Sequence, residues 1–325
     1  MTLPSLQDIL AAQRRIAPFV VHTPLLRHEA LDAALQARTF VKPECLQRFG
    51  AFKARGAFNA LAAMSPQQRR NGVVAFSSGN HAQAVAGAAR SFKVPATIVM
   101  PKDAPTAKIE NTKALGAEVI LYDRLTEDRE AIGKAIAAEH NAPIVPPFDN
   151  ANVIAGQGTA GLEIGNDLST LGLAADVAYV CASGGGLASG ISLALRAFNP
   201  AIQIYAVEPV GHERIARSLA AGERVSNAPG VRSICDALMA DKMGALPWAL
   251  AQSIGMGAVS VNDDQVREAM RFAFAHLRIV LEPGGAAALA AALFSGIDVT
   301  GKTVAIVASG GNVDPGVFAD VLAHR

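Results

Sequence analysis

Hydrophobic and polar positions fall into two repeating patterns along most of the chain. Short, mainly aliphatic runs are typical of buried parallel strands, and they lie at residues 73–76, 96–100, 117–122, 142–145, 176–182, 202–207, 257–261 and 303–309. Longer segments with apolar residues at helical spacing alternate with these runs, over residues 80–91, 105–115, 126–140, 154–169, 187–197, 263–277 and 285–294. Ser5, followed three residues later by Asp8, predicts a helix near the N-terminus, and a last helix ends the chain.

Regular alternation of strands and helices predicts parallel or mixed sheets with crossover helices, and hence an α/β fold of two domains. A first series of four strands closes before residue 150, and a second series begins there. We therefore predict a small α/β domain over residues 66–149 and a larger domain built from residues 1–65 and 150–325. The sequence contains neither a low-complexity linker nor a short internal repeat.

Composition narrows the class of protein further. Of the 325 residues, 51% are hydrophobic, 29 are glycine and only 5% are aromatic, which suits an α/β core better than a β-sandwich. The 29 basic and 28 acidic residues leave a net charge of +1, which gives no indication of nucleic-acid or membrane-surface binding. No apolar run reaches membrane-spanning length, the N-terminus lacks a signal-peptide pattern, and three scattered cysteines without a CxxC motif favour a reducing cytoplasm.

One lysine has an unusual context. Lys53 lies between Gly50 and Gly56 in the mostly apolar stretch FGAFKARGAF. Burial removes water from an ammonium group and favours the neutral, nucleophilic amine, which an imine-forming lysine needs. The alternative is a lysine that extends from a helix end into solvent. This stretch alone favours that alternative, because most lysines are surface residues, and the rest of the chain has to decide.

A glycine-rich stretch, SGGGLASG at residues 183–190, joins a predicted strand to a predicted helix. Successive glycines let backbone N–H groups converge, and the helix dipole adds positive potential, so this turn predicts a phosphate site. Ser189 stands where a dinucleotide fingerprint has its third glycine, which favours a small phosphate group over a dinucleotide. A tight turn that needs glycine only for packing is the alternative.

Polar residues also open the helix predicted at residue 80, in the stretch SSGNHAQA. Ser77, Ser78 and Asn80 offer donors at a helix N-terminus, which suits a carboxylate, and ordinary helix capping is the alternative. We interpret His81 as an orienting residue at most. Ser309 follows the last predicted strand, at the sheet edge where ligands of open α/β sheets gather.

Two other stretches have ordinary structural interpretations. LEPGGAA, residues 281–287, is a helix start with Glu282 and Gly284 near it, which can belong to the site, and plain capping is a plausible alternative. GIDVTGKT, residues 296–303, matches the P-loop pattern. A P-loop needs a strand before it and a helix after it, and here that order is inverted, so we interpret this match as a turn.

Lys53 and the glycine- or serine-rich turns at residues 77–84, 183–190, 281–287 and 308–316 together describe one pocket. This pocket would hold a phosphate, a carboxylate and an imine-forming amine. Pyridoxal 5'-phosphate with a bound amino acid has these three requirements. The chain resembles the fold-type II pyridoxal-phosphate enzymes, which have the tryptophan synthase beta-like fold, and specifically the threonine/serine dehydratase and serine racemase family. The resemblance is carried, in order, by TPLL (23–26), KPECLQRFGAFKARGAFNAL (42–61), SSGNHAQA (77–84), VIAGQGTAGLEI (153–164), SGGGLASG (183–190), VEP (207–209), EPGGAAALAA (282–291) and SGGN (309–312).

The resemblance implies a role for each candidate residue. Lys53 would be the Schiff-base lysine, and Phe52 would lie along the cofactor ring. Asn80 would contact the phenolic oxygen of the cofactor, and Ser309 its pyridine nitrogen. The backbone N–H groups that would hold the phosphate belong to Ser183, Gly184, Gly185, Gly186 and Leu187. The residues implied to bind the substrate are Ser77, Ser78, Asn80, His81 and Arg129.

The same resemblance implies an activity, that of a dehydratase (ammonia-lyase) which converts L-threonine or L-serine to a 2-oxo acid and ammonia. A neutral serine at the ring nitrogen makes the cofactor a moderate electron sink, which suits β-elimination once Lys53 has removed the Cα proton. 3-Hydroxyaspartate stays open as a substrate through Arg129. A proton delivered by Ser78 to the opposite face would instead make a racemase. A catalytically silent phosphate-binding protein and a β-replacement synthase are weaker alternatives.

The resemblance also bears on metal ions and on assembly. Metal-dependent relatives pair the acid matched by Glu208 with a second acid six residues further on, where this chain has Arg214. We therefore expect no metal site, and we hypothesise that the charge of Arg214 fills that place. The implied assembly is a homodimer whose ligand is a small amino acid, without nucleic-acid or membrane partners.

Overall fold

The computed structural model describes residues 2–77, 79–104, 106–228 and 230–324. The N-terminal segment contains α1 (Leu6–Ile16), α2 (Glu29–Leu35), β1 (Arg38–Pro43), two short 3-10 turns, η1 (Glu44–Leu46) and η2 (Arg48–Gly50), and α3 (Lys53–Ala63). The predicted start of α1 is confirmed, because the Ser5 hydroxyl accepts a hydrogen bond from the Asp8 N–H and the Asp8 carboxylate accepts one from the Ser5 N–H. The strand β1 was not among those predicted.

A small parallel sheet follows, with the strand order β2-β3-β4. Its strands and helices are α4 (Pro66–Arg69), β2 (Val73–Phe76), α5 (Asn80–Phe92), β3 (Ala96–Pro101), α6 (Thr106–Ala114), β4 (Glu118–Tyr122) and α7 (Arg129–Glu139). Except for α4, which was not predicted, these bounds agree with the predicted elements to within a few residues. The predicted strand at residues 142–145 is reduced to one parallel bridge between Ile144 and Val74.

The larger sheet is also parallel and has the strand order β1-β8-β5-β6-β7. Its later strands are β5 (Val177–Cys181), β6 (Gln203–Pro209), β7 (Gly257–Val261) and β8 (Thr303–Ala308). β1 pairs with β8 from Arg38–Thr303 to Pro43–Ala308, which joins the N-terminal segment to the last strand of the chain. This pairing is what the predicted larger domain requires, whereas the boundaries at residues 65/66 and 149/150 stay a prediction.

The helices that follow residue 150 are α8 (Ala151–Thr170), α9 (Gly186–Leu195), α10 (Arg214–Ala221), α11 (Ala245–Ile254), α12 (Asp263–Phe272), α13 (Pro283–Phe294) and α14 (Pro315–Ala323). A 3-10 turn η3 (Asp236–Leu238) precedes α11, and a π-helical turn η4 (Ala273–Leu277) completes the helix predicted over residues 263–277. Neither α10 nor α11 was predicted. Pro247 lies in the first turn of α11, where its missing N–H costs no helical hydrogen bond.

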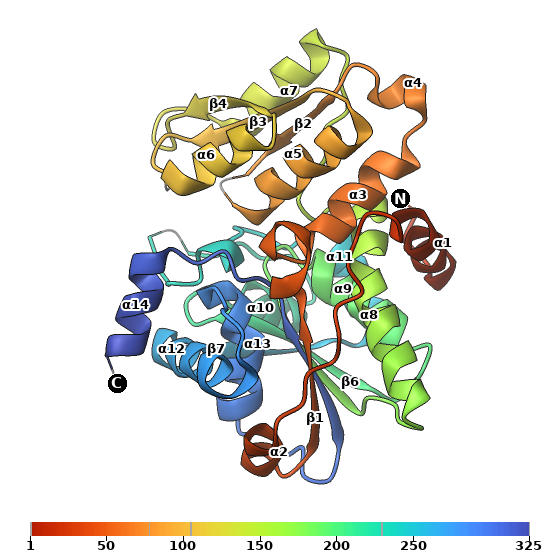
Figure 1. Ribbon diagram of the computed structural model, residues 1–325, viewed down its shortest axis with the longest axis vertical. Helices are drawn as coiled ribbons and strands as arrows, with labels where there is room; N and C mark the ends of the chain where they lie inside the picture. Colours follow the sequence, from red (N-terminus) through yellow and green to blue (C-terminus); the bar gives the residue numbers. More distant parts are fainter. Residues whose placement is uncertain (1, 78, 105, 229, 325) are drawn as a thin grey trace.

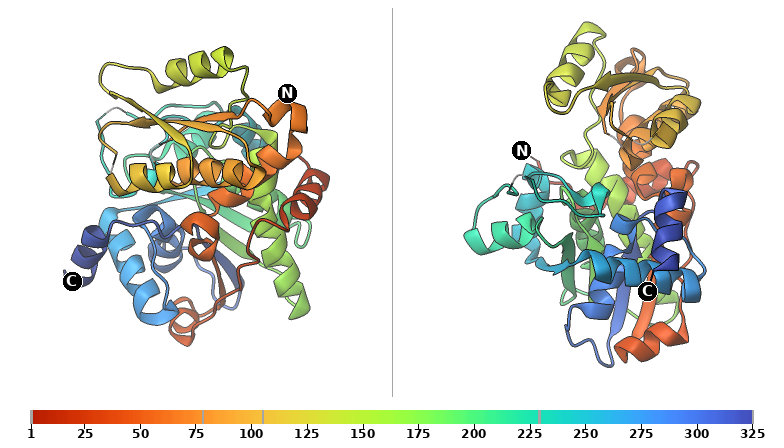
Figure 2. Two further views of the ribbon diagram at one scale, coloured as in Figure 1. Left: turned by 45° about the horizontal axis from the view of Figure 1, so that its top comes forward. Right: turned by 90° about the vertical axis from the view of Figure 1, so that its left-hand side faces the viewer.

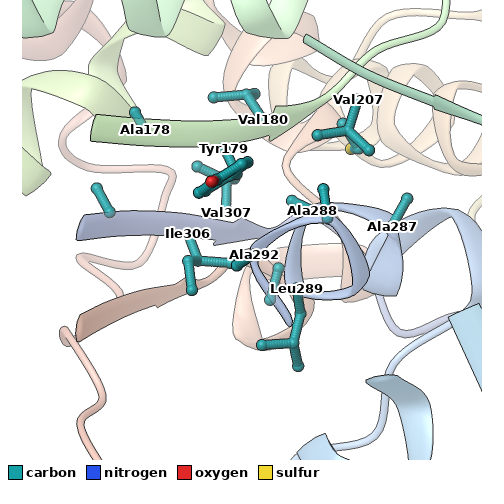
Figure 3. Packing of buried hydrophobic residues seen from close by; sticks show 14 of the residues in the cluster. Ala178, Tyr179, Val180, Val207, Ala287, Ala288, Leu289, Ala292, Ile306 and Val307 are labelled. Carbon is teal, nitrogen blue, oxygen red and sulfur yellow. The ribbon is translucent and has the colours of Figure 1, made fainter. Parts of the chain in front are cut away.

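The main core lies between the large sheet and α13, whose residues from Pro283 to Ala292 are buried. Figure 3 shows this packing, with Tyr179 of β5 and Val307 of β8 close to Ala288 and Ala292 of the helix. Alanine has the smallest side chain that still supports a helix, so an alanine-rich face lets α13 approach the strands closely. Among the described residues, no helix is both long and apolar enough to span a bilayer.

The two sheets form separate layers, with the small sheet at the top of Figure 1 and the large sheet below it. Figure 2 shows the same separation from two further sides. The helix α3 packs against α5 of the small sheet and against α8 of the larger unit. Lys53, the first residue of α3, therefore lies at the junction between the two sheets.

Candidate active site

A cavity of about 470 Å³ lies at this junction, where β2, β5 and β8 end. This is the usual place for a ligand, because open parallel sheets bind ligands at the carboxyl ends of their strands. The cavity is lined by Phe52, Lys53, Phe76, Ser77, Gly79, Asn80, His81, Lys108, Arg124, Arg129, Pro147, Phe148, Cys181 to Leu187, Asp236 to Asp241, Glu282 and Ser309. Every described residue of the predicted site is among them. Ser78, predicted as a catalytic and substrate-binding residue, lies outside the described residues.

Lys53 presents its amine to this cavity. Its Nζ donates a hydrogen bond to the carbonyl oxygen of Pro147 at 2.6 Å and lies 5.1 Å from the ring centroid of Phe52. Loss of hydration on burial lowers the pKa of Lys53 to about 8. No carboxylate forms an ion pair with Nζ among the described residues. A lysine amine of this kind can act as a nucleophile and as a proton acceptor near neutral pH.

The glycine turn follows β5 and forms another wall of the cavity. Gly185 has φ +91° and precedes Gly186, the first residue of α9. A side chain on Gly184 would overlap the ring of Phe148, and a Cβ on Gly185 would lie 2.7 Å from the Met243 methyl carbon. The first N–H groups of a helix have no intrahelical acceptor, so those of Gly186 and Leu187 are available to an anion. The turn therefore fits a phosphate group.

Ser309 follows β8 and is almost fully buried. Its hydroxyl oxygen accepts a hydrogen bond from the Cys181 thiol at 2.9 Å, and its carbonyl oxygen accepts one from the Phe52 N–H at 3.0 Å. These two contacts connect the end of β8 to β5 and to the residue before Lys53. Ser309 thus offers a neutral hydroxyl to the cavity.

A network of amide and carboxyl groups surrounds Asn80. Its side-chain N–H donates to Glu282 at 2.6 Å, and its side-chain oxygen accepts from Asn312 at 2.8 Å. Because α5 carries Asn80 and α13 begins after Glu282, this network joins the small sheet to the large one. The interpretation of Glu282 as a helix cap is wrong, since its side chain makes no capping hydrogen bond. Burial, with a contribution from Asp236, raises the pKa of Glu282 to about 7.

The raised pKa of Glu282 predicts a pH effect on the stability of the unliganded protein. Between the unfolded value near 4.5 and the folded value near 7, the folded protein binds this proton more tightly. The stabilisation is present below pH 4.5 and is lost as the pH rises to 7. Relative to Glu282→Gln, the wild type should therefore lose on the order of 3 kcal/mol of unfolding free energy across this window. Urea unfolding at several pH values measures the difference, and parallel profiles for the two proteins would contradict it.

His81 is buried beside this network. Its Nε2 lies 2.8 Å from the carbonyl oxygen of Val145, which can only accept, so this nitrogen carries the proton. Burial lowers the pKa of His81 to about 3, and Lys53 adds to this effect. Its Nδ1 has no partner among the described residues. A neutral ring with one fixed proton agrees with an orienting role and excludes a cationic carboxylate-binding role.

The remaining substrate-binding candidates lie toward the small sheet. Ser77 accepts a hydrogen bond from the Gly79 N–H at 3.3 Å. Arg129 is exposed at the start of α7, and its guanidinium carbon lies 5.9 Å from the ring centroid of Phe76. Unlike Lys108, which pairs with Asp236, and Arg124, which pairs with Asp103, Arg129 forms no ion pair within the described part of the chain. One cavity-lining guanidinium is thus left for a ligand.

The wall formed by residues 236–241 was not among the predicted site residues. It faces Lys108 of α6, whose amine pairs with Asp236 at 2.8 Å across the cavity. Such a contact joins positions more than a hundred residues apart and has no local sequence signal. Among the residues that the structure describes, no group of three or more His, Cys, Asp or Glu side chains could hold a metal ion.

An amine of lowered pKa beside a glycine-lined phosphate turn is the arrangement that pyridoxal-phosphate chemistry requires. Comparison with known proteins agrees. The chain belongs to the family of pyridoxal-phosphate dependent enzymes, whose family model matches residues 16–310. Pyridoxal 5'-phosphate is therefore its cofactor, and the predicted fold-type II α/β architecture is confirmed.

Individual relatives cover nearly the whole chain. It is 40% identical over 326 residues to the L-threo-3-hydroxyaspartate ammonia-lyase of Saccharomyces cerevisiae, spanning 100% of this chain and 98% of the relative. The solved structure of maize serine racemase superposes with a TM-score of 0.92 at 38% identity, over 99% and 98% of the two chains. The solved structure of the T.th. threonine deaminase superposes with a TM-score of 0.90 at 39% identity, over 96% and 99%.

Proposed function

We propose that this chain is a pyridoxal-phosphate-dependent ammonia-lyase that converts a β-hydroxy amino acid to a 2-oxo acid and ammonia. The observation that carries the proposal is the Lys53 amine, which has a pKa lowered to about 8 and faces the cavity. The names of the relatives support a hydroxy-amino-acid substrate, because they include ammonia-lyases for 3-hydroxyaspartate and threonine. L-Threonine and L-serine are the first substrates to test.

We assign each step of the proposed reaction to particular groups. When bound, the cofactor supplies a covalent link to an amine and a conjugated ring that accepts electrons from Cα. The glycine turn would hold its phosphate through N–H groups, and Ser309 would present a neutral hydroxyl to its ring. Lys53 accepts the Cα proton, which its lowered pKa permits near pH 7. Ser77 and Asn80 orient the substrate carboxylate at the N-terminus of α5.

An ammonia-release assay on the purified holoenzyme tests this proposal. The substrates are L-threonine, L-serine and both diastereomers of 3-hydroxyaspartate, and the remaining substrate is analysed on a chiral column. Ammonia from one of them, with the chirality of the remainder intact, is the expected result. Racemase is the alternative function, since serine racemases are among the relatives. Appearance of the opposite enantiomer without ammonia release would instead identify the protein as a racemase.

Arg129 favours a dicarboxylic substrate as a second candidate. A guanidinium at the cavity without a carboxylate partner can bind the β-carboxylate of 3-hydroxyaspartate, which threonine and serine lack. Arg129→Met is therefore expected to raise KM for 3-hydroxyaspartate by about 10- to 100-fold. KM for threonine should change by less than about threefold.

The matched control for this prediction is Arg124→Met, because Arg124 also lines the cavity but is already paired with Asp103. Steady-state kinetics on the two substrates give the comparison. An equal rise in KM for 3-hydroxyaspartate and for threonine in Arg129→Met would remove the dicarboxylate argument. The same selective rise in Arg124→Met would assign the role to Arg124 instead.

We further propose a homodimer in the cytoplasm, with a small domain at residues 66–149. The family resemblance supports the dimer, and the scattered free cysteines support a reducing compartment. The pairing of β1 with β8 supports grouping residues 1–65 with residues 150–325. Sedimentation equilibrium measures the assembly directly.

A further inference from the structure

Arg214 is a fully buried arginine that the steps above do not use. It is the first residue of α10, near the centre of Figure 1, and its side chain is 0% exposed. Burying a guanidinium is costly unless nearly all of its N–H groups find acceptors. The location of those acceptors therefore indicates what the residue does.

The acceptors are mainly backbone carbonyl oxygens of the cavity wall. Nε donates to Ser183 at 3.0 Å, and Nη2 donates to Ala182 at 3.2 Å and to Leu238 at 3.1 Å. Nη1 donates to His212 at 2.9 Å. The guanidinium thus connects the turn after β5 with the opposite wall at residues 236–241.

Within the described part of the chain, the only carboxylate in ion-pair range of this guanidinium belongs to Glu208, and Asp241 acts on it from further away. The Glu208 carboxylate lies 3.5 Å from Nη1, which is long for an ion pair. Its oxygens instead accept the N–H groups of Ile215 and Ala216 at 3.0 Å, at the start of α10. The Glu208 carboxyl therefore fixes the helix that carries Arg214, and the positive charge is directed at the carbonyl oxygens.

Peptide geometry gives this arrangement a consequence for phosphate binding. In a planar trans peptide the C=O and the following N–H point in opposite directions. Holding the carbonyl oxygens of Ala182 and Ser183 on one side therefore turns the N–H groups of Ser183 and Gly184 to the other side. The carbonyl oxygen of Gly184, held by the Gly244 N–H at 3.0 Å, orients the next N–H in the same way.

We propose that Arg214 is a positioning residue for the cofactor phosphate, acting as a built-in cation behind the glycine turn. It orients and polarises the peptide groups whose N–H atoms face the phosphate. It also holds Leu238, so that the turn and the opposite cavity wall keep one spacing. The inference rests on cofactor binding and not on the substrate, so it stands whether the enzyme is a lyase or a racemase.

Four variants of the full-length holoenzyme test the proposal: Arg214→Lys, Arg214→Met, Arg214→Asp and the control Arg217→Asp. Arg217 lies on the same helix but is exposed and donates to Ser226 and Asn227, away from the cavity. The readouts are the Kd for pyridoxal 5'-phosphate, the ³¹P resonance of the bound phosphate and the melting temperature. None of these requires turnover.

Arg214→Met is expected to weaken cofactor binding about tenfold or more, and Arg214→Lys less, because the lysine keeps the charge with fewer donors. Arg214→Asp puts a carboxylate beside Glu208 among the carbonyl oxygens, which are ligands that hard divalent cations prefer. In EDTA this variant should bind the cofactor weakly, and added Mg²⁺ or Ca²⁺ should restore binding. The wild type and Arg217→Asp should respond to neither EDTA nor the cations.

Two results would overturn the proposal. One is a folded Arg214→Met that binds the cofactor as tightly as the wild type, with an unchanged ³¹P resonance. The other is an equal loss of cofactor affinity in all three Arg214 variants, with no recovery of Arg214→Asp on addition of a divalent cation. A packing role alone would then explain the loss. If Arg214→Asp does not fold, the comparison of lysine with methionine decides: better binding by Arg214→Lys supports a role for the charge, and equal binding rejects it.

Discussion

Replacement of Lys53 by alanine is expected to lower kcat by about 10³-fold or more. Two lysines line the described cavity, and Lys53 is the one whose amine has no carboxylate partner. Its pKa is lowered to about 8. Loss of a general base alone costs about 10²- to 10⁴-fold, and Lys53→Ala also removes the covalent attachment of the cofactor. Borohydride reduction followed by peptide mass spectrometry should find the cofactor on Lys53 in the wild type and on no residue in the variant.

Lys108→Ala is the matched control for this substitution. Lys108 is a second lysine at the cavity, but its amine pairs with Asp236. Borohydride should still attach the cofactor to Lys53 in this variant. Attachment at Lys108 in the wild type, or ammonia release by Lys53→Ala at the wild-type rate, would contradict the assignment.

The parts of the fold that could be predicted from sequence are those with a local signal. The buried strands β5 and β8 are mainly aliphatic runs, and the turn after β5 contains three adjacent glycines. β1 was missed although all its residues after Arg38 are buried, because its sequence RTFVKP includes Lys42 in a fully buried position. A lysine inside a strand normally indicates exposure to solvent. Here an ion pair with Glu163, far along the chain, and a hydrogen bond to the Thr23 carbonyl oxygen make its burial possible.

The residues of the candidate site also divide into those with a local sequence signal and those without one. Lys53, Asn80 and Ser309 are found from motifs because each stands beside glycines at the end of a strand or the start of a helix. Glu282 was interpreted as a cap, since a carboxylate before a helix usually binds its first N–H groups. Its side chain instead binds Asn80, a contact across 202 positions that no local pattern encodes. The pairing of Lys108 with Asp236 in the wall at residues 236–241 has no local sequence pattern for the same reason.

The chain holds Lys53 in place through a second buried arginine. Arg55 lies two residues further along α3 and is fully buried. Its guanidinium makes paired hydrogen bonds to Glu44, at 2.7 and 2.8 Å, and to Glu163, at 2.7 Å each. Lys42 pairs with the same Glu163 at 2.6 Å. Two cations thus balance two carboxylates, and the cluster fixes α3 against η1 and α8.

Arg55→Met is expected to lower the free energy of unfolding by about 3–5 kcal/mol, because it leaves buried carboxylates without their main partner. Urea unfolding at pH 7 measures this loss. The control is Arg267→Met, since Arg267 pairs with the exposed Asp264 and should contribute less than about 1 kcal/mol. A loss of under 1 kcal/mol in both variants would mean that the cluster relaxes without cost and does not anchor α3. If it does anchor α3, cofactor binding by Arg55→Met should weaken as well, because the helix that presents Lys53 has lost its attachment to Glu44 and Glu163.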